Sequence, residues 1–246
     1  MKRKTIAVIP ARFGSTRFPG KVLALLRGRP IIQWVYERTA ASKADTVLIA
    51  TDNEKVADAA RSFGAVAVMT SPEHPSGTDR IKEAVKGIEG DVVINVQGDE
   101  PLIPTETINQ LIDKMLDTPS LEMATVAVPA ARKIIENNPN IVKLVLDNNN
   151  FALYFSRSMI PFLRTGGSDM ETYRHWGIYA YRRDVLDKFV KLPEGSLEKC
   201  EKLEQLRALE NGIRIYVLFS DFQSIGIDTP EDLEAAESFL KENKSF

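Results

Sequence analysis

The sequence predicts an α/β fold built on a doubly wound, mostly parallel, Rossmann-like sheet. Short apolar runs alternate with segments of helical spacing over the first 120 residues, as in strands joined by crossover helices. The apolar runs contain few polar residues, which is typical of strands that are buried on both faces. Polar segments follow several of these runs, and ligands of such sheets bind outside the carboxyl ends of the strands.

The expected elements of the first half follow one another regularly. We expect strands at residues 6–9, 46–50, 65–69 and 91–96. We expect helices at residues 30–41, 54–63 and 81–88. Pro30 suits the first position of its helix, and Asn53 is a suitable cap for the next helix.

From about Leu121 the pattern changes, which indicates a second lobe within one α/β unit spanning residues 1–246. We expect a strand at residues 123–129, a short helix after it and a hairpin at residues 142–156. We then expect a long helix at residues 199–211, a strand at residues 214–219 and a last helix from residue 230 onward. Gly212 suits the end of the long helix, and Thr229 with Pro230 suits the start of the last one.

The loop after the first strand carries the clearest functional signal. Pro10 ends the strand, because proline cannot donate to a sheet ladder. The loop contains two glycines and three cationic side chains, Gly14, Gly20, Arg12, Arg17 and Lys21. Residues 1–36 contain eight Lys or Arg and no Asp or Glu, although the net charge of the chain is −2. This segregation favours binding of a compact polyanion over a long nucleic acid, with a solvated basic loop as the alternative.

The loop matches neither standard nucleotide motif. A P-loop has four residues between its glycines and a Ser or Thr after its lysine, whereas five residues separate Gly14 from Gly20 and Val22 follows Lys21. A G-x-G-x-x-G fingerprint is absent from the sequence as well.

The composition narrows the class of protein. Hydrophobic residues make up 43% and charged residues 27%, as in ordinary globular proteins. One cysteine, Cys200, excludes an internal disulfide, suits a reducing compartment and has no nearby base to activate it. No apolar run approaches the roughly 18 residues of a membrane span, so we expect a cytoplasmic protein with no membrane partner. Two histidines and one cysteine also make a zinc site improbable.

Two carboxylates are candidate ligands for Mg²⁺. Asp99 and Asp228 each follow an apolar, strand-like segment and suit a hard cation that also binds phosphate oxygens. The alternatives are a turn aspartate at Asp99 and a helix cap at Asp228. Three polar segments, residues 10–21, 72–80 and 97–101, follow strands of the sheet. We therefore expect them to meet in one site.

Residues 151–181 contain eight of the 19 aromatic residues of the chain. Clustered aromatic side chains are typical of an interface with substrate or with another subunit. A second aromatic core beneath a lid is the alternative.

Several motifs in the right order resemble a known family. The first reads I-P-A-R-x-x-S-T-R-x-P-G-K over residues 9–21. The others are residues 76–80, 95–101, 138–143, 155–157, 174–179, 203–207 and 226–233. Together they resemble the sugar-acid cytidylyltransferases, and the later blocks resemble the branch that acts on 3-deoxy-manno-octulosonate (Kdo), the CMP-Kdo synthetases.

This resemblance implies a nucleotide lobe at approximately 1–120 and 212–246, and a sugar-binding and dimerisation lobe at approximately 121–211. It implies transfer of CMP from CTP to Kdo with release of pyrophosphate, in lipopolysaccharide biosynthesis, by an Mg²⁺-dependent homodimer. A rival acceptor is sialic acid or amino-Kdo. A glycosyltransferase is less well supported, because Pro101 stands where those enzymes usually have the second Asp of Asp-x-Asp. A nucleotide sensor without activity would not need both carboxylates and Lys21.

The resemblance also implies roles for individual residues. Catalytic roles fall to Lys21, Arg12, Arg17, Asp99 and Asp228, with Lys21 stabilising charge on the α-phosphoryl group. Nucleotide contacts fall to Pro10, Ala11, Arg12, Lys21, Ser76 and Arg80. Sugar-acid contacts fall to Gln97, Arg157, His175, Tyr179 and Glu204, and the Arg157 guanidinium suits the acceptor carboxylate. From pattern alone His175 could be structural and Glu204 a solvated surface residue. The segment between Arg164 and Tyr173 is shorter than the family pattern.

Overall fold

The computed structural model describes residues 3–14, 17–165, 170–222 and 225–243. The chain forms two compact units, Met1–Leu116 with Ser224–Phe246, and Asp117–Gln223. The resemblance implies that approximately residues 212–246 belong to the first lobe. In the structure β11 (Ile215–Phe219) belongs to the second unit, because it pairs in parallel with β7 (Met123–Pro129).

A parallel sheet forms the centre of the first unit. Its strands are β1 (Thr5–Pro10), β4 (Thr46–Thr51), β5 (Val66–Met69) and β6 (Val92–Asn95). They lie in the order β6-β1-β4-β5, and Val8 of β1 is level with Leu48 on one side and Asn95 on the other. Residues 6–9 are fully buried, as a strand between two neighbours and two helical layers should be.

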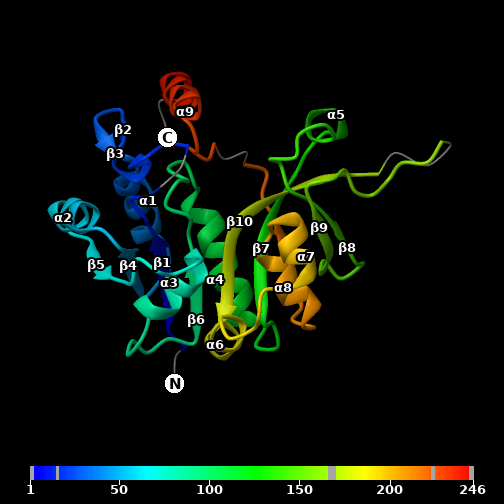
Figure 1. Ribbon diagram of the computed structural model, residues 1–246, viewed down its shortest axis with the longest axis horizontal. Coiled ribbons are helices and arrows are strands. Elements are labelled where there is room, and N and C mark those ends of the chain that lie inside the picture. Colours follow the sequence, from blue (N-terminus) through cyan, green and yellow to red (C-terminus); the bar gives the residue numbers. More distant parts are fainter. Residues whose placement is uncertain (1–2, 15–16, 166–169, 223–224, 244–246) are drawn as a thin grey trace. The chain divides into compact units, whose positions relative to one another are not determined.

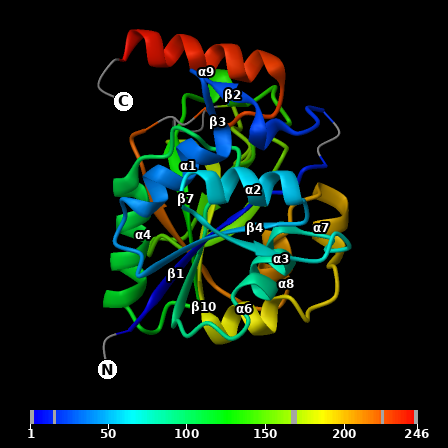
Figure 2. The ribbon, with the colours of Figure 1, turned by 90° about the vertical axis from the view of Figure 1, so that its left-hand side faces the viewer.

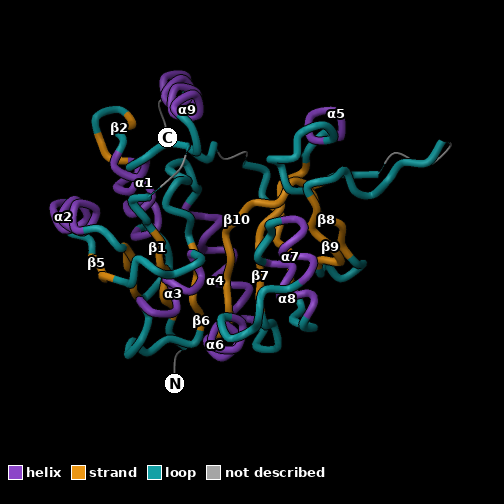
Figure 3. Tube along the Cα trace, in the orientation of Figure 1, coloured by secondary structure: helices purple, strands orange, loops and turns teal. Residues whose placement is uncertain are grey.

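Helices and strands alternate through this unit (Figure 3). The helices are α1 (Ile31–Ala40), α2 (Glu54–Ser62), α3 (Gly77–Ala84), α4 (Thr105–Asp117) and α9 (Pro230–Glu242). α1 and α2 connect strands in one direction along the sheet, whereas α3 returns from β5 to β6. Right-handed crossovers therefore place α3 on the opposite face from α1 and α2. The doubly wound α/β fold is confirmed.

α9 brings the last part of the chain back to the first unit. It lies beside the small hairpin of β2 (Leu25–Leu26) and β3 (Arg29–Pro30) (Figures 1 and 2). Arg27 at the hairpin turn donates to the Leu240 carbonyl oxygen at 2.8 Å. The predicted cap of α9 is confirmed, since the Thr229 hydroxyl accepts from the amide of Asp232.

α3 begins four residues earlier than the sequence analysis predicts, and the expected bounds of 81–88 are wrong. The Ser76 hydroxyl accepts from the Asp79 amide at 3.2 Å and caps the helix there. Residues 77–80, expected in a loop, form its first turn. A candidate nucleotide contact, Ser76, is therefore also a helix cap.

The second unit is a mixed sheet around β7. β11 pairs with β7 in parallel, and the long strand β10 (Tyr173–Arg182) pairs with it antiparallel. The predicted hairpin is confirmed as β8 (Lys143–Leu146) and β9 (Ala152–Ser156). The sequence analysis assigns no element to the residues of β10, in which four aromatic residues interrupt any simple alternation.

The described residues of the second unit also form four short helices: α5 (Arg132–Ile135), α6 (Arg183–Phe189), α7 (Ser196–Glu201) and α8 (Gln205–Glu210). The prediction of one helix at 199–211 is wrong, because Lys202 has a left-handed backbone (φ 54°) and separates α7 from α8. A bidentate pair between Glu198 and Arg207 spans this break, with distances of 2.6 and 2.7 Å. This ion pair favours two separate helices over the single helix that the sequence pattern predicts.

The aromatic residues of 151–181 divide between core and surface. Phe155, Trp176, Tyr179 and Tyr181 are buried, whereas Phe162 is 84% exposed. An aromatic core is therefore present, and the interface expected from this cluster stays a prediction. None of the described helices is long and apolar enough to cross a membrane.

Candidate active site

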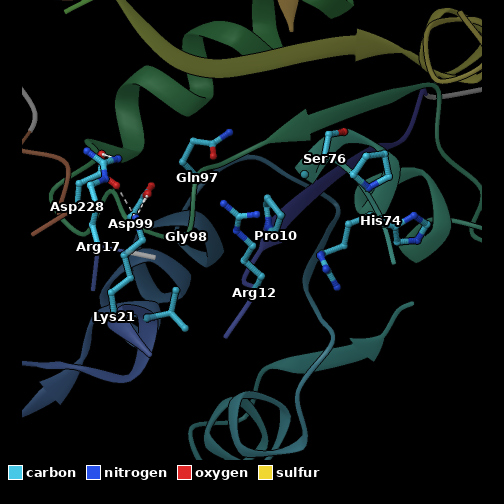
Figure 4. A pocket seen from close by; sticks show the side chains of 14 residues that line it. Pro10, Arg12, Arg17, Lys21, His74, Ser76, Gln97, Gly98, Asp99 and Asp228 are labelled. Atoms are coloured by element: carbon cyan, nitrogen blue, oxygen red, sulfur yellow. Dashed lines mark hydrogen bonds and ion pairs between the residues drawn. The ribbon is translucent and has the colours of Figure 1, made fainter. Parts of the chain in front are cut away.

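A cavity of about 300 Å³ lies in the first unit. Residues from all three predicted polar segments line it, together with Asp228: Pro10, Arg12, Arg17, Lys21, Val22, His74, Pro75, Ser76, Gly77, Arg80, Gln97, Gly98 and Asp99. Figure 4 shows Lys21, Asp99, Asp228 and Arg17 at one side, and Ser76 and His74 at the other. The site thus has an ionic end and a helix-cap end.

Parallel strand ends bring these segments together. β1 and β6 are neighbours, and the loops that follow them approach closely at Gly98. A Cβ atom at Gly98 would lie 2.7 Å from the carbonyl oxygen of Pro10, so only glycine fits without a backbone shift. The cavity therefore depends on a contact between two main chains.

Lys21 bridges the two candidate metal ligands. Its ammonium nitrogen is 2.5 Å from an Asp99 carboxylate oxygen and 2.8 Å from one of Asp228. Arg17 binds the other Asp228 oxygen at 2.8 Å. The Ile227 amide donates to the Asp99 carbonyl oxygen at 2.8 Å, which fixes the two acidic segments side by side.

The charges of this cluster stabilise one another. Burial by itself lowers the pKa of Lys21, but Asp99 and Asp228 outweigh it and the pKa of the ammonium lies above its usual value. Burial raises the pKa of Asp228, yet Lys21 and Arg17 bring the pKa of this carboxyl below its ordinary range. Lys21 is therefore cationic and Asp228 anionic at neutral pH.

The donor set fits a hard cation. Asp99 and Asp228 both direct an oxygen at the same ammonium group, so their oxygens already converge on one positive charge. Among the described residues no group of three or more His, Cys, Asp or Glu could hold a metal. Two carboxylates are enough for Mg²⁺ when phosphate oxygens and waters complete its coordination.

The other predicted nucleotide residues differ in accessibility. Arg12 is exposed, and among the described residues no hydrogen bond or ion pair engages it. Arg80 is buried and donates to Asp52 and Thr70. Ala11 is fully buried, does not line the cavity, and its amide donates to Ala50. Ser15 and Thr16 of the family motif lie outside the described residues.

His74 also lines this cavity, although the sequence analysis assigns it no role. Its Nε2 atom pairs with Glu83 of α3. The Ser71 amide and then His74 lower the pKa of the Glu83 carboxyl below its usual value. In the sequence, only the place of His74 in the polar segment 72–80 indicates a role in the site. Its partner Glu83 lies nine residues further on, so no local motif joins the two.

Of the five predicted sugar-acid contacts, Gln97 lies in the first unit and lines the cavity, while the other four belong to the second unit. His175 and Tyr179 are two of these four, and their rings are 5.4 Å apart between centroids. Burial, then Tyr181 and Glu204, raises the pKa of Tyr179 well above its usual value. The structure therefore places His175, Tyr179 and Glu204 near one another.

A buried threonine organises this group. The Thr125 hydroxyl of β7 donates to the Ile178 carbonyl oxygen at 2.7 Å and lies 3.0 Å from Nε2 of His175. A hydroxyl has one proton, so His175 donates from Nε2 to Thr125. The register between β7 and β10 shifts between Trp176 and Tyr179, and this bulge sets the direction of both candidate side chains.

Arg157 follows β9 and is held by main-chain acceptors. Its guanidinium donates to the carbonyl oxygens of Glu201, Pro139 and Lys202 at 2.7, 2.9 and 3.4 Å. The fully buried Lys143 donates in turn to the Arg157 carbonyl oxygen at 2.7 Å. Arg157 therefore has a structural role here, and a substrate carboxylate would have to share or replace these acceptors.

A cavity in which cationic side chains surround two converging carboxylates, at the carboxyl edge of a parallel sheet, is typical of the nucleotide-binding site of an α/β transferase. The chain belongs to the cytidylyltransferase family, whose model matches residues 6–215. The resemblance stated from the sequence motifs is confirmed.

The relatives of known name agree over nearly the whole chain. A 3-deoxy-manno-octulosonate cytidylyltransferase of Thermodesulfovibrio yellowstonii is 52% identical, and one of Trichlorobacter lovleyi is 47% identical. Each alignment covers 96% of this chain and 98% of the relative. An 8-amino-3,8-dideoxy-manno-octulosonate cytidylyltransferase of Shewanella baltica is 49% identical over 95% of this chain and 97% of the relative.

Solved structures agree with this assignment. A CMP:2-keto-3-deoxy-manno-octonic acid synthetase complexed with CTP is 41% identical, with a TM-score of 0.93 over 98% of this chain and 99% of that chain. A cytidylyltransferase from Leptospira borgpetersenii has a TM-score of 0.64 at 18% identity, over 99% of this chain and 96% of that chain, and shows the fold alone.

The half-buried His175 of β10 should contribute to acid sensitivity. Burial lowers the pKa of His175 to about 3 in the folded protein, against about 6.5 in an unfolded chain. Between these values the unfolded state binds more protons, so the free energy of unfolding should fall as pH decreases, by up to about 1.4 kcal/mol per pH unit. His175→Gln should flatten this decline in urea unfolding between pH 6.5 and 4. Equal slopes for the two proteins would contradict the assignment.

Proposed function

We propose that the protein transfers CMP from CTP to Kdo and releases pyrophosphate, as a step of lipopolysaccharide biosynthesis in the cytoplasm. The observation that carries the proposal is the Lys21–Asp99–Asp228 cluster at the sheet edge, in a chain 47–52% identical to two 3-deoxy-manno-octulosonate cytidylyltransferases. Kdo is the acceptor and CTP the donor.

Different residues of the cavity are assigned to the phosphates and to the nucleoside of CTP. Arg12 faces solvent and is available to bind phosphate, while Arg17 and Lys21 extend the positive wall. Lys21 is assigned to stabilising the charge that builds on the α-phosphoryl group as pyrophosphate leaves. Pro10, Ser76 and Arg80 lie at the end assigned to the nucleoside. Main-chain groups there read the base.

Asp99 and Asp228 would hold Mg²⁺. When bound, the ion supplies charge neutralisation for the triphosphate and polarises the phosphorus under attack. In the protein alone, Lys21 keeps both carboxylates in place, so the ligand oxygens are positioned before the nucleotide arrives.

Gln97 of the first unit, and Arg157, His175, Tyr179 and Glu204 of the second unit, are assigned to the acceptor. A guanidinium suits the carboxylate that every sugar acid carries, and the phenol and imidazole suit hydroxyl groups. We also assign nucleotide binding to the first unit, and acceptor binding and dimerisation to the second.

A second acceptor has specific support. The relative from Shewanella baltica, at 49% identity, is named for 8-amino-3,8-dideoxy-manno-octulosonate. The amino sugar differs from Kdo at one carbon, so the two activities share a reaction and a nucleotide site.

Pyrophosphate release from CTP, UTP, ATP and GTP, each against Kdo, 8-amino-Kdo and sialic acid, tests the proposal. We expect turnover with CTP and Kdo to exceed every other pair. Higher kcat/KM with 8-amino-Kdo would establish the second candidate. Absence of turnover with all three sugar acids would refute the function.

Asp99→Asn and Asp228→Asn should each abolish turnover and leave the fold intact, because an amide is a poor ligand for Mg²⁺. Turnover measured against Mg²⁺ concentration, with circular dichroism as a check of folding, decides the matter. Glu89→Gln, altered at an exposed acid that pairs with Lys4, is the control and should keep full activity. Near-normal turnover of either aspartate variant at limiting Mg²⁺ would show that this residue is not a ligand.

Arg157→Ala should weaken acceptor binding at least tenfold, about 1.4 kcal/mol, and leave CTP affinity unchanged. Arg157→Lys should restore part of the loss, since a point charge lacks the planar fork. Saturation curves for both substrates measure this.

Arg182→Ala is the matched control for Arg157, because Arg182 also donates to carbonyl oxygens of the second unit, those of Leu121 and Thr118. Its loss should lower stability without changing the acceptor KM. If Arg157→Ala instead raises the CTP KM alone, Arg157 serves the nucleotide.

The protein should be a homodimer through the second unit. Ile134, Phe162, Leu163 and Met170 are large apolar residues with 63, 84, 41 and 54% exposure, on or near α5. Light scattering at micromolar concentration should give a dimer, and Phe162→Ser should shift it toward monomer. Leu153→Ser, altered at a 60% exposed residue of β9, is the control. A wild-type monomer would contradict the proposal.

A further inference from the structure

Asp52 is the acidic residue that joins two parts of the cavity wall without lining the cavity itself. It follows the carboxyl end of β4, and its side chain is 16% exposed. No role for Asp52 follows from the sequence, and the catalytic and metal-binding roles proposed above do not include it.

One oxygen of Asp52 holds Arg80. The Arg80 guanidinium donates to Oδ2 of Asp52 at 2.7 Å and to the Thr70 hydroxyl at 2.5 Å. Thr70 in turn donates to the Thr51 carbonyl oxygen at 3.0 Å. The Arg80 side chain is only 4% exposed, yet it lines the cavity. A cation buried to this extent needs a paired anion, and Asp52 supplies it.

The other oxygen of Asp52 holds the basic loop. The Phe13 amide donates to Oδ1 of Asp52 at 3.3 Å. Two residues earlier, the Ala11 amide donates to the Ala50 carbonyl oxygen at 2.8 Å. These two bonds fix the main chain on both sides of Arg12, whose side chain is exposed and lines the cavity. The position of Arg12 therefore depends on the carboxyl end of β4.

We propose that Asp52 is a positioning residue for CTP: one carboxylate sets the loop that carries Arg12 and the guanidinium of Arg80 at a fixed spacing. A triphosphate nucleotide needs its cationic contacts at defined distances, and residues fixed before binding lose less entropy when the ligand arrives. The inference rests on the proposed use of this cavity for CTP.

The test is CTP binding by calorimetry, without acceptor, in the full-length protein. Asp52→Asn keeps the side-chain volume and an oxygen for Phe13 but removes the charge that holds Arg80. It should raise the Kd of CTP about tenfold. Steady-state kinetics should show a similar rise in the KM for CTP, with kcat and the acceptor KM within threefold of wild type. Asp52→Glu keeps the charge but displaces both partners, so it should also weaken CTP binding.

Asp45→Asn is the matched control. Asp45 lies at the opposite end of the same strand region and accepts from the amide and hydroxyl of Thr5, both at 2.9 Å. Its substitution should lower stability in urea by an amount similar to Asp52→Asn and leave the Kd of CTP unchanged. An equal rise in Kd for Asp45→Asn would mean that general destabilisation is the cause, and would overturn the proposal.

A double substitution separates this inference from the proposed function. Arg12→Ala should weaken CTP binding, and Asp52→Ala added to it should raise the Kd by a smaller factor than Asp52→Ala does alone, because removing the whole carboxylate also frees the Phe13 amide and so acts in part through Arg12. If Arg12→Ala leaves the Kd unchanged, the proposed use of the cavity fails and the inference with it. If Arg12→Ala weakens binding while Asp52→Asn stays within twofold of wild type, only the inference is overturned.

Discussion

The ammonium of Lys21 between Asp99 and Asp228 is the interaction on which the candidate active site depends. It joins the loop after β1, the loop after β6 and the segment before α9, which are far apart in the sequence. At 13% exposure of the lysine side chain, these charges are weakly screened by water. Without the lysine, two nearby carboxylates would repel each other, so the cluster gives the acidic residues a stable geometry before any ligand binds.

Backbone contacts set the frame in which this cluster forms. The close approach of Gly98 to Pro10 brings the β1 and β6 loops together, and the capped start of α3 places Ser76 at the same cavity. Asp52 adds a side-chain bridge between the β4 end and two walls of the site. The candidate catalytic side chains are thus carried by main-chain segments that the parallel strands bring to a single edge, and ion pairs between side chains fix them there.

In the second unit, hydrogen bonds stabilise polar groups that are buried within a small mixed sheet. The Thr125 hydroxyl donates to the Ile178 carbonyl oxygen at the bulge of β10 and accepts a hydrogen bond from the imidazole of His175. Lys143 is fully buried and finds the carbonyl oxygens of Asn138 and Arg157. Both of these buried donors are paired, as low dielectric surroundings require. Two candidate acceptor residues, His175 and Arg157, are therefore held by hydrogen bonds to Thr125 and Lys143.

The sequence by itself determined the strands of the first unit, the caps at Asn53 and Thr229, the basic loop and the family. Each follows from local spacing or from a contiguous motif, and local patterns survive wherever tertiary contacts agree with them. Only the tertiary structure decided the break between α7 and α8, the bulge of β10, the partners of Arg157 and the bridging position of Asp52. These features depend on bonds between residues far apart in the sequence, such as Asp52 with Arg80, 28 positions apart, and Thr125 with Ile178, 53 positions apart, or on ion pairs across a chain reversal. No periodicity records such pairs, because a side chain's partner is set by how the elements pack.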